Sequence, residues 1–286
     1  MERVLAIVVT FNGIKWLERC LGSLRNSCPR PDIVVIDNGS VDGTRECIRA
    51  NYPEVELYQR DDNPGFGAAN NIGLRLALKR GYDYVYLLNQ DAWVEKDTIR
   101  LLIEAANQAY GILSPVQNDA GGRMDRQFER KCGKYLLDGQ TVAEVPFVMA
   151  AHWLIPVDVV RRVGGFSPAF RQYGEDDNYI DRLHYFGLKC AVVPAARATH
   201  DRSTRHTPKD KRMRLKCIAV VVRLSSPLRP FGLRVALAPF ELAGMAVKNL
   251  SPVPLRFIPS LFGQMSEIRK IRSISKGPGA FLKEAE

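Results

Sequence analysis

The sequence predicts an α/β protein with a mostly parallel central sheet, helices on both faces of that sheet, and a C-terminal helical extension. Short apolar runs alternate with segments of helical spacing through the first 200 residues, as in strands joined by crossover helices. One run, Tyr84 to Val94, passes abruptly into Asn89-Gln90-Asp91. Because ligands of open parallel sheets bind outside the carboxyl ends of the strands, we expect Asp91 at a binding site. The alternative is that Asp91 caps the next helix or closes a turn.

In order, the chain starts with a strand over Val4 to Phe11. Apolar runs predict further strands at Ile33 to Ile36, Val55 to Tyr58, Gly111 to Val116 and Cys190 to Val193. Apolar residues three and four apart predict helices at Gly13 to Asn26, Val41 to Asn51, Phe66 to Lys79, Asp97 to Ala109 and Tyr179 to Phe186. The polar stretch Gly121 to Gly139 is expected to be a solvated loop.

The composition is that of a globular chain. Of 286 residues, 46% are hydrophobic and 25% are charged, so disorder is not expected. The six cysteines include no Cys-x-x-Cys pair, which argues against a zinc cluster or a disulfide framework. Met1 leads directly into the first predicted strand without a signal-peptide pattern, so we expect a cytoplasmic protein.

Positive charge is concentrated at one end of the chain. Residues 201–286 contain 17 Lys and Arg against 6 Asp and Glu, whereas residues 1–200 contain 24 against 25. This distribution favours a protein that rests on an anionic membrane surface over one that binds nucleic acid. The first strand is not followed by Gly-x-Gly-x-x-Gly, and Gly-Lys-Ser/Thr is absent from the sequence. A hydride-transfer enzyme and the usual nucleoside triphosphatases are therefore not expected.

The basic end also has an amphipathic pattern. Phe231 to Leu250 is mostly apolar, and Arg234, Glu241 and Lys248 are seven residues apart, so they form one polar stripe on a helix. Pro239 would bend this helix, and with the charges it makes a poor membrane span. We expect the helix to lie in the plane of the membrane interface. The alternatives are that it packs on the rest of the chain or forms an oligomer interface.

Four motifs occur in order at comparable spacing: Val9 to Asn12, Val35 to Thr44, Asn63 to Gly73 and Leu87 to Asp91. Together they resemble the family 2 glycosyltransferases of the GT-A fold, most of all the rhamnosyltransferases and galactofuranosyltransferases. The resemblance covers residues 3–200. It implies a GT-A catalytic domain over residues 1–205, with a nucleotide-sugar-binding half (1–116) and an acceptor-side half (117–205), followed by the basic tail at 206–286.

The resemblance implies an inverting hexosyltransferase. It would move a rhamnose-like or other hexose from a nucleoside-diphosphate sugar to a hydroxyl of a glycan or lipid-linked acceptor, in bacterial cell-surface polysaccharide synthesis. Its expected place is the inner face of the cell membrane, as a peripheral protein. Two other interpretations stay open. A nucleotidyltransferase-like enzyme would need a second acidic metal site and a basic phosphate loop, which are not evident. A catalytically silent nucleotide-sugar-binding protein is disfavoured by intact Asp91 and Asp176, while Asn89 keeps it open.

Short polar side chains near the strand ends are the candidates for binding the nucleotide sugar. Thr10 and Asn12 follow the first strand, and Asp37 and Asn38 follow the second, where they can hydrogen-bond a base and a ribose. Turn formation would explain any one of them alone. Free N–H groups near the start of the third helix can meet phosphate or sugar oxygens. The other donor-site candidates are Asn63, Gly65, Asn70, Asn89, Gln90 and Asp91.

Asp91 matches the last acid of the metal-binding Asp-x-Asp motif in this family, but Asn89 stands in place of the first acid. One carboxylate, together with amide and substrate oxygens, can hold Mn²⁺ or Mg²⁺, although with less charge than the full motif. His200 matches the histidine that completes the metal shell in several family members. A lone histidine can also be purely structural.

On the acceptor side, Glu175 and Asp176 resemble the Glu-Asp motif of the family, in which the Asp is the general base. Crowded like charges raise the pKa of a carboxyl, which suits a base, although acids before a helix also favour its dipole. Asn178 stands where the family usually has a further Asp. His152 and Trp153 are candidates to line the acceptor site, Trp153 by stacking on a sugar ring; burial in the core is the alternative.

Overall fold

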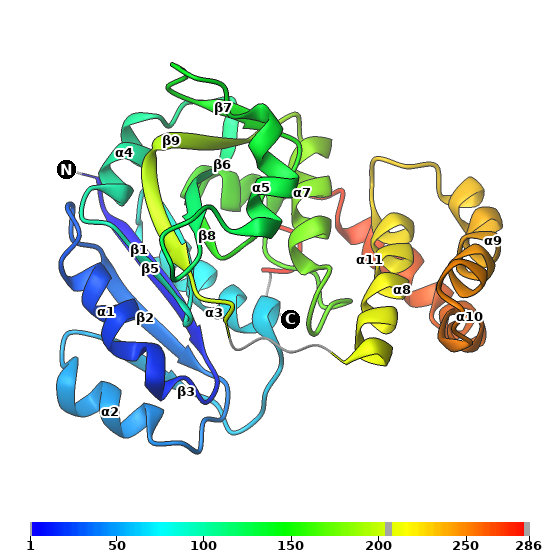
Figure 1. Cartoon of the computed structure of the whole chain (residues 1–286), viewed down its shortest axis with the longest axis horizontal. Coiled ribbons are helices and arrows are strands. Elements are labelled where there is room, and N and C mark those ends of the chain that lie inside the picture. Colours follow the sequence, from blue (N-terminus) through cyan, green and yellow to red (C-terminus); the bar gives the residue numbers. More distant parts are fainter. Residues whose placement is uncertain (1, 204–207, 283–286) are drawn as a thin grey trace.

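Nine strands form one sheet in the part of the chain described by the computed structural model, residues 2–203 and 208–282 (Figure 1). The strands are β1 (Val4–Thr10), β2 (Asp32–Asp37), β3 (Glu56–Gln59), β4 (Tyr84–Asn89), β5 (Ala92–Val94), β6 (Tyr110–Asn118), β7 (Ala143–Val145), β8 (His152–Pro156) and β9 (Lys189–His200). Hydrogen-bonded neighbours follow the order β3-β2-β1-β4-β8-β6-β9-β5, and β7 also pairs with β9.

The first four strands along the chain are mutually parallel, as predicted. In their register Thr10 pairs with Asp37, and Val9 pairs with Asn89. Parallel strands in this register end at one edge of the sheet. The polar residues that follow β1, β2 and β4 therefore lie near one another.

The second half of the sheet is mixed. β8 lies antiparallel between β4 and β6, and β9 runs parallel to β6. The run Tyr84 to Val94, which the sequence presents as one stretch, divides into β4 and β5 at Gln90 and Asp91. The short β5 leaves β4 and pairs antiparallel with the end of β9, where Ala92 is opposite His200. This change of partner brings Asp91 next to the end of β9.

Helices cover both faces of the sheet because the strand residues alternate between them. Leu5 and Ile7 of β1 face one cluster, and Ala6 and Val8 face the other. The first face carries α3 (Phe66–Arg80), α5 (Arg126–Cys132), α6 (Val157–Val163) and α7 (Glu175–Tyr185). The second face carries α1 (Leu17–Arg25), α2 (Thr44–Asn51) and α4 (Thr98–Glu104).

Two expectations about helices need correction. The stretch Gly121 to Gly139 contains α5, which is capped by the Asp125 side chain and buries Phe128 and Cys132. Two apolar anchors were too few to show this short helix in the sequence. The helix predicted over Asp97 to Ala109 ends earlier, at Glu104. Single-turn 3-10 helices, η1 (Ile14–Trp16) and η2 (Gly133–Tyr135), complete this part of the chain.

The basic end forms four helices beside the sheet domain (Figure 1). They are α8 (Lys209–Ser225), α9 (Phe231–Asn249), α10 (Val253–Gly263) and α11 (Met265–Ile274). Their buried side chains make a separate apolar cluster, which Phe170 of the sheet domain joins. The predicted boundary between residues 205 and 206 lies outside the described residues. No helix in the described ranges combines the length and the apolar character needed to cross a bilayer.

The polar stripe expected on α9 is partly turned inward. Glu241 pairs with Arg223 of α8, with an N–O distance of 2.7 Å, and with Arg234, with an N–O distance of 3.3 Å. Exposed apolar side chains occupy the outward face of the helix instead. These are Leu233, Leu237, Phe240 and Val247.

The chain returns to the sheet domain after α11. The Gly165 N–H donates to the Ala280 carbonyl over 2.8 Å, and the Phe281 ring lies against the Arg182 guanidinium. The side chain of Leu282 joins the main core cluster. The helical extension is thus attached to the sheet domain at both of its ends.

Candidate active site

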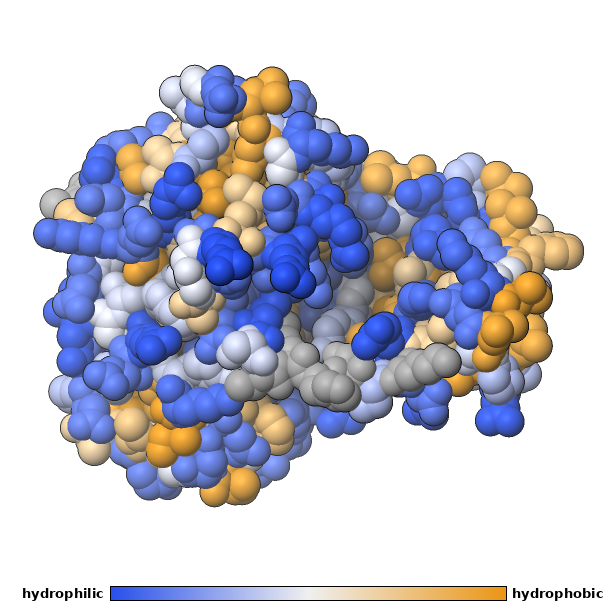
Figure 2. Space-filling model, viewed as in Figure 1, coloured by the Kyte–Doolittle hydropathy of each residue, from blue (hydrophilic) through white to orange (hydrophobic). Residues whose placement is uncertain are grey.

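A cleft of about 780 Å³ lies between the carboxyl ends of the strands and the helices of the basic end. Figure 2 shows a hydrophilic hollow between the two parts of the molecule. One wall comes from the strand ends and the loop that follows β3: Thr10, Phe11, Asn38, Asn63, Gly65, Asn89, Gln90 and Asp91. A second wall is the segment 169–173, and a third comes from α8, α10 and the residue after α10: Ile218, Val221, Phe257 and Gln264.

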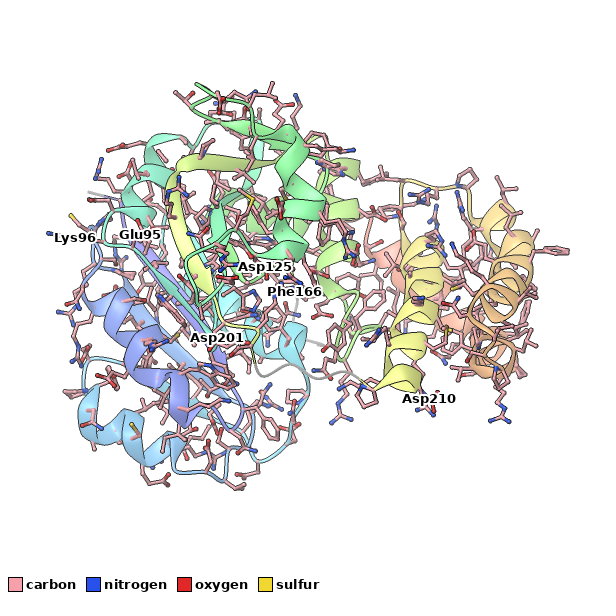
Figure 3. All side chains as sticks on the ribbon, in the orientation of Figure 1. Glu95, Lys96, Asp125, Phe166, Asp201 and Asp210 are labelled. Atoms are coloured by element: carbon pink, nitrogen blue, oxygen red, sulfur yellow. The ribbon has the colours of Figure 1, made fainter. Side chains whose placement is uncertain are left out.

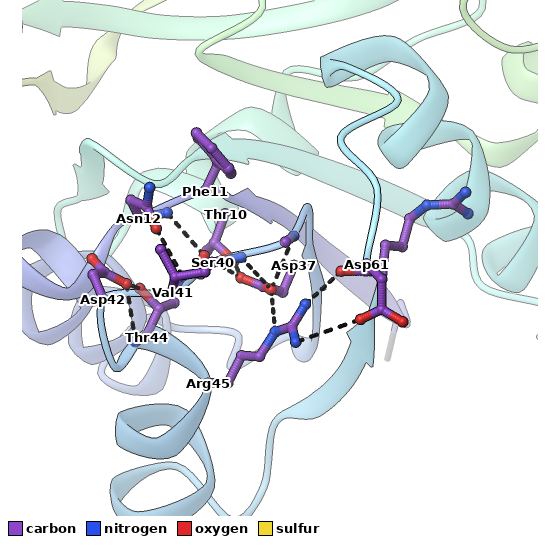
Figure 4. A network of polar contacts seen from close by, with 12 residues as sticks. Thr10, Phe11, Asn12, Asp37, Ser40, Val41, Asp42, Thr44, Arg45 and Asp61 are labelled. Carbon is purple, nitrogen blue, oxygen red and sulfur yellow. Dashed lines mark hydrogen bonds and ion pairs between the residues drawn. The ribbon is translucent and has the colours of Figure 1, made fainter.

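Asp37 is fully buried behind this wall rather than on it. Its carboxylate accepts hydrogen bonds from the Thr10 hydroxyl, the Ser40 hydroxyl and backbone N–H, and the Arg45 guanidinium (Figure 4). Burial alone would raise the pKa of Asp37, but these hydrogen bonds hold it below its ordinary value. That Asp37 contacts the donor stays a prediction. Its acceptor positions are used to hold the ends of β1 and β2 together.

Asn38 lines the cleft, as was expected of both Asn38 and Asp37. Its amide nitrogen donates to Asn63 Oδ1 over 3.5 Å and to the Gly65 carbonyl over 3.4 Å. Its Oδ1 is buried and has no hydrogen-bond partner among the described residues. A buried acceptor without a partner is costly, so this atom is suited to a ligand N–H or O–H.

Of the other donor-side candidates, some line the cleft and some lie behind the residues that line it. Gln90 spans the cleft wall, where its Oε1 accepts from the Phe11 N–H over 2.9 Å and its Nε2 donates to the Phe11 carbonyl. Asn12 adopts a positive φ of 50° and accepts from the Val41 N–H, so it supports the turn after β1. Asn70 is buried and donates to the Phe66 carbonyl within α3. Neither Asn12 nor Asn70 lies on the cleft wall.

Asp91 and His200 meet at one edge of the cleft. Asp91 Oδ1 lies 3.4 Å from His200 Nε2, and both side chains are almost fully buried, with 6% and 1% exposure. The Asp201 N–H donates to the Asp91 carbonyl over 2.8 Å, which fixes the two segments together. Asp201 itself lies near the middle of the sheet domain in Figure 3. Asn89, which also lines the cleft, has a buried Oδ1 without a hydrogen-bond partner in the described chain.

Three acids form the first turn of α7, just beyond the end of the cleft wall at Tyr173. Burial, and then the charge of Asp177, raises the pKa of Glu175 to about 7. The pKa values of Asp176 and Asp177 are also raised, by burial and by the neighbouring carboxyls. The helix begins at Glu175, so the three acids belong to its first turn and do not precede it as predicted. Their protonation is linked, so they titrate as a group near neutral pH.

A family model named glycosyl transferase family 2 matches residues 5–164, which is more than half of the chain. The chain belongs to glycosyl transferase family 2. An N-acetylglucosaminyl-diphospho-decaprenol L-rhamnosyltransferase of Mycobacterium tuberculosis is 29% identical over 239 residues, 71% of this chain and 78% of that relative. The predicted family, with its rhamnosyltransferase branch, is confirmed.

Another family member, the undecaprenyl-phosphate mannosyltransferase of Micrococcus luteus, is 34% identical over 125 residues. This match covers 43% of the present chain and 51% of the relative, so the chain spans about half the length of that protein.

Solved structures give the fold. The mannosyltransferase PcManGT from Pyrobaculum calidifontis, in complex with GDP-Man and Mn²⁺, superposes with a TM-score of 0.58 at 17% identity, over 96% of this chain and 86% of that chain. GalNAc-T7 with UDP, GalNAc and Mn²⁺ gives a TM-score of 0.65 at 16% identity, over 96% and 55% of the two chains. The predicted GT-A fold is confirmed.

In this family 2 protein the two acceptor-side candidates of β8 are core residues. His152 is fully buried, where its ring nitrogens contact the Tyr86 hydroxyl and the Thr199 carbonyl, each over 3.0 Å. Burial lowers its pKa to about 3, so the ring is neutral. Trp153 donates to the Val148 carbonyl and stacks on Phe166. Both side chains thus have the core position that was the alternative for them, because β8 is a central strand covered on both faces.

Several cleft residues were not predicted from the sequence. Arg171 and Gln172 follow the buried Phe170 on the segment before α7, and Ile218 and Phe257 belong to the basic end. The nearby motif Tyr173-Gly174-Glu175 was a signal for the first two. Apolar periodicity in α8 and α10 gave no indication that one face of each helix meets the cleft.

Proposed function

We propose that this chain is an inverting glycosyltransferase that moves a hexose from a nucleoside-diphosphate sugar to a hydroxyl of a glycan or lipid-linked acceptor. The observation that carries the proposal is the meeting of Asp91 and His200, 3.4 Å apart, at the edge of a cleft beyond which the acids of α7 begin. Glycosyl transfer needs charge compensation for a diphosphate leaving group and a base for the acceptor. The two groups of residues offer these two functions.

For the donor, the polar wall of the cleft is the proposed binding surface. Asn38 Oδ1 is a buried acceptor suited to an N–H of the base, and Asn63 and Gly65 adjoin it. Thr10 and Gln90 line the same wall. Thr10 ends β1 and Gln90 follows β4, which is adjacent to β1 in the sheet, and Asp91 comes directly after Gln90. Asp37, Asn12 and Asn70 are proposed to position this wall rather than to touch the donor.

The residues present fit a divalent cation. Asp91 supplies a carboxylate, His200 an imidazole nitrogen, and Asn89 an amide oxygen without a partner in the described chain. No group of three His, Cys, Asp or Glu residues suited to a metal occurs among the described residues, so substrate oxygens would have to complete the shell. When bound, Mn²⁺ or Mg²⁺ would supply positive charge for the diphosphate. Neighbours of the same fold, PcManGT and GalNAc-T7, carry Mn²⁺ in their solved structures.

The proposed base is Asp176, with Glu175 beside it. Its carboxylate takes the proton of the acceptor hydroxyl, and the hydroxyl oxygen forms the new bond to the anomeric carbon. The bond from that carbon to the diphosphate oxygen breaks, and its electron pair leaves with the diphosphate. A pKa raised by burial and neighbouring carboxyls makes the ionised group a stronger base near neutral pH.

We propose further that residues 206–286 hold the catalytic domain, residues 1–205, on an anionic membrane. The outward face of α9 is apolar, and Phe240 and Val247 keep 75% and 76% of their surface exposed. Figure 2 shows hydrophobic residues along the outer edge of this helical part. Apolar side chains among basic ones suit the interface of a bilayer. We therefore propose that the protein acts on the inner face of a bacterial cell membrane, where a lipid-linked acceptor for cell-surface polysaccharide would be available.

Thermal-shift measurements with UDP-, dTDP- and GDP-sugars, with and without Mn²⁺ or Mg²⁺, test the donor site. One nucleotide class should raise the melting temperature in a metal-dependent way, because a ligand that binds only the folded state stabilises it. Asp91→Ala should abolish this rise. Glu95→Ala should not, because Glu95 is an exposed residue just after β5 that does not line the cleft and lies on the side of the sheet domain away from the C-terminal helices (Figure 3). No response of the folded wild-type protein to any nucleotide sugar would contradict the proposal.

A further inference from the structure

The cleft contains one positive and one negative side chain among the described residues that line it. The positive one is Arg171, on the segment before α7, and the negative one is Asp91, on the strand side. A nucleoside-diphosphate sugar brings two negative charges into this space, and bond cleavage adds a further charge to the departing diphosphate. Because Asn89 stands in place of a second acid, the strand side would hold a cation through few anionic ligands. The positive charge of Arg171 on the other wall therefore becomes more important for neutralising the diphosphate.

Arg171 forms no ion pair with a carboxylate of the described residues. Its Nη2 donates to the Asn63 carbonyl over 2.8 Å, and no carboxylate of the described chain lies within 4.0 Å of its guanidinium. The nearby Asp62 is engaged by Arg60 instead, through N–O distances of 2.8 and 3.0 Å. The remaining N–H groups of Arg171 are available to a ligand in the cleft.

The backbone holds Arg171 against the donor-side loop. A Cβ atom added to Gly65 would lie 1.8 Å from the Arg171 carbonyl oxygen, so the two segments touch through main-chain atoms. Gly65 in turn adjoins the Asn38 amide. The guanidinium is thus anchored beside the wall proposed to bind the nucleotide, although it belongs to the acceptor-side half of the chain.

We infer that Arg171 binds the diphosphate of the donor and stabilises it as a leaving group. A guanidinium presents paired N–H donors that match two phosphate oxygens, and it stays charged at any physiological pH. The inference rests on the proposed function and adds a donor-binding residue to it. It also specifies the ligand chemistry, because the residue recognises the diphosphate and not the base or the sugar.

Isothermal titration of the full chain with uridine, UMP and UDP, and with the matching thymidine and guanosine series, tests this assignment. Arg171→Gln removes the charge and keeps a hydrogen-bond donor for the Asn63 carbonyl. We expect it to weaken binding of the nucleoside diphosphate about 10- to 100-fold and to leave nucleoside binding unchanged. Arg171→Lys should retain part of the affinity. Arg49→Gln, which removes an exposed cation of α2 that does not line the cleft, is the matched control and should match wild type.

Diphosphate binding by Arg171→Gln that equals wild type, or an equal loss for nucleoside and diphosphate, would overturn the assignment while leaving the proposed function intact. A wild-type protein that binds no nucleotide of any series would overturn both. Because Arg171 is exposed and the substitution is polar, folding should be preserved, and circular dichroism with a thermal melt checks this for each variant.

Discussion

The Arg182 guanidinium lies 5.0 Å from the centre of the Phe281 ring, and this contact ties the returning end of the chain to the helix that carries the candidate base. Arg182 is fully buried, and burial lowers its pKa to about 10. It donates to the carbonyls of Val163 and Gly165 and to Asn178 Oδ1. The residue therefore holds together α6, α7 and the segment after α11.

Arg182→Met should lower the free energy of unfolding by about 2–4 kcal/mol, because two buried carbonyl groups lose their donor. Urea unfolding followed by circular dichroism measures the change. Arg161→Met, which removes an exposed Arg of an i,i+3 ion pair, should cost about 0.5 kcal/mol or less. Equal losses for the two variants would show that the buried contacts contribute nothing.

Asp176→Asn should reduce kcat by about 10²–10⁴-fold, since an amide cannot take the acceptor proton. Affinity for the nucleoside diphosphate should stay within about twofold of wild type, because the acids lie beyond the cleft wall. Steady-state kinetics with titration of the diphosphate separates the two effects. Asp181→Asn, in the next turn of α7, is the matched control. Full activity of Asp176→Asn would transfer the role of base to Glu175 or Asp177.

Glu175 should make stability depend on pH. Its folded-state pKa, about 7, lies above the ordinary 4.5, so between these values the folded protein binds more protons than the unfolded chain. The free energy of unfolding should fall as pH rises from about 4.5 through about 7. Glu175→Gln should remove part of this fall, on the order of 2 kcal/mol. Urea unfolding at pH 5 and pH 8 measures it, with the exposed Glu95→Gln as control. A parallel fall in both variants would assign the effect to other groups.

Gly65→Ala should destabilise the protein and weaken donor binding together. The position has a φ of +95°, and the new methyl group would meet the Arg171 carbonyl. We expect a loss of about 2 kcal/mol or more in unfolding free energy. Gly22→Ala is a helical control with open space around it, and should be neutral or stabilising by up to about 1 kcal/mol. Thermal melts with and without nucleotide compare the two variants, and wild-type behaviour of Gly65→Ala would refute the close approach.

Phe240→Ser combined with Val247→Ser should reduce binding to anionic vesicles by roughly tenfold or more, since two exposed apolar side chains of α9 are lost. Folding stability should hardly change, because neither side chain packs in the core. Co-sedimentation with vesicles that contain phosphatidylglycerol measures binding. Val41→Ser, an exposed apolar residue of the sheet domain, is the control. Undiminished sedimentation of the double variant would remove α9 from the membrane contact.

Local pattern was sufficient for the strands and for much of the cleft. Apolar runs located β1, β2 and β4, and parallel pairing requires that such strands end at one edge of the sheet. The neighbourhood of Thr10, Asn38 and Asp91 followed from that rule. The family resemblance then identified His200 as the group that meets Asp91, which no spacing in the sequence indicates.

Only the tertiary structure decided which polar residues face the cleft. Asp37 and Asn38 are adjacent in the sequence and chemically similar, yet Asp37 accepts five hydrogen bonds from the protein, whereas Asn38 Oδ1 has no hydrogen-bond partner among the described residues. His152 and Trp153 are buried because β8 is inserted between β4 and β6. Arg171 and the apolar residues of α8 and α10 reach the cleft through contacts between distant segments. Periodicity along the chain specifies which side of an element is apolar; what covers that side depends on how all elements pack.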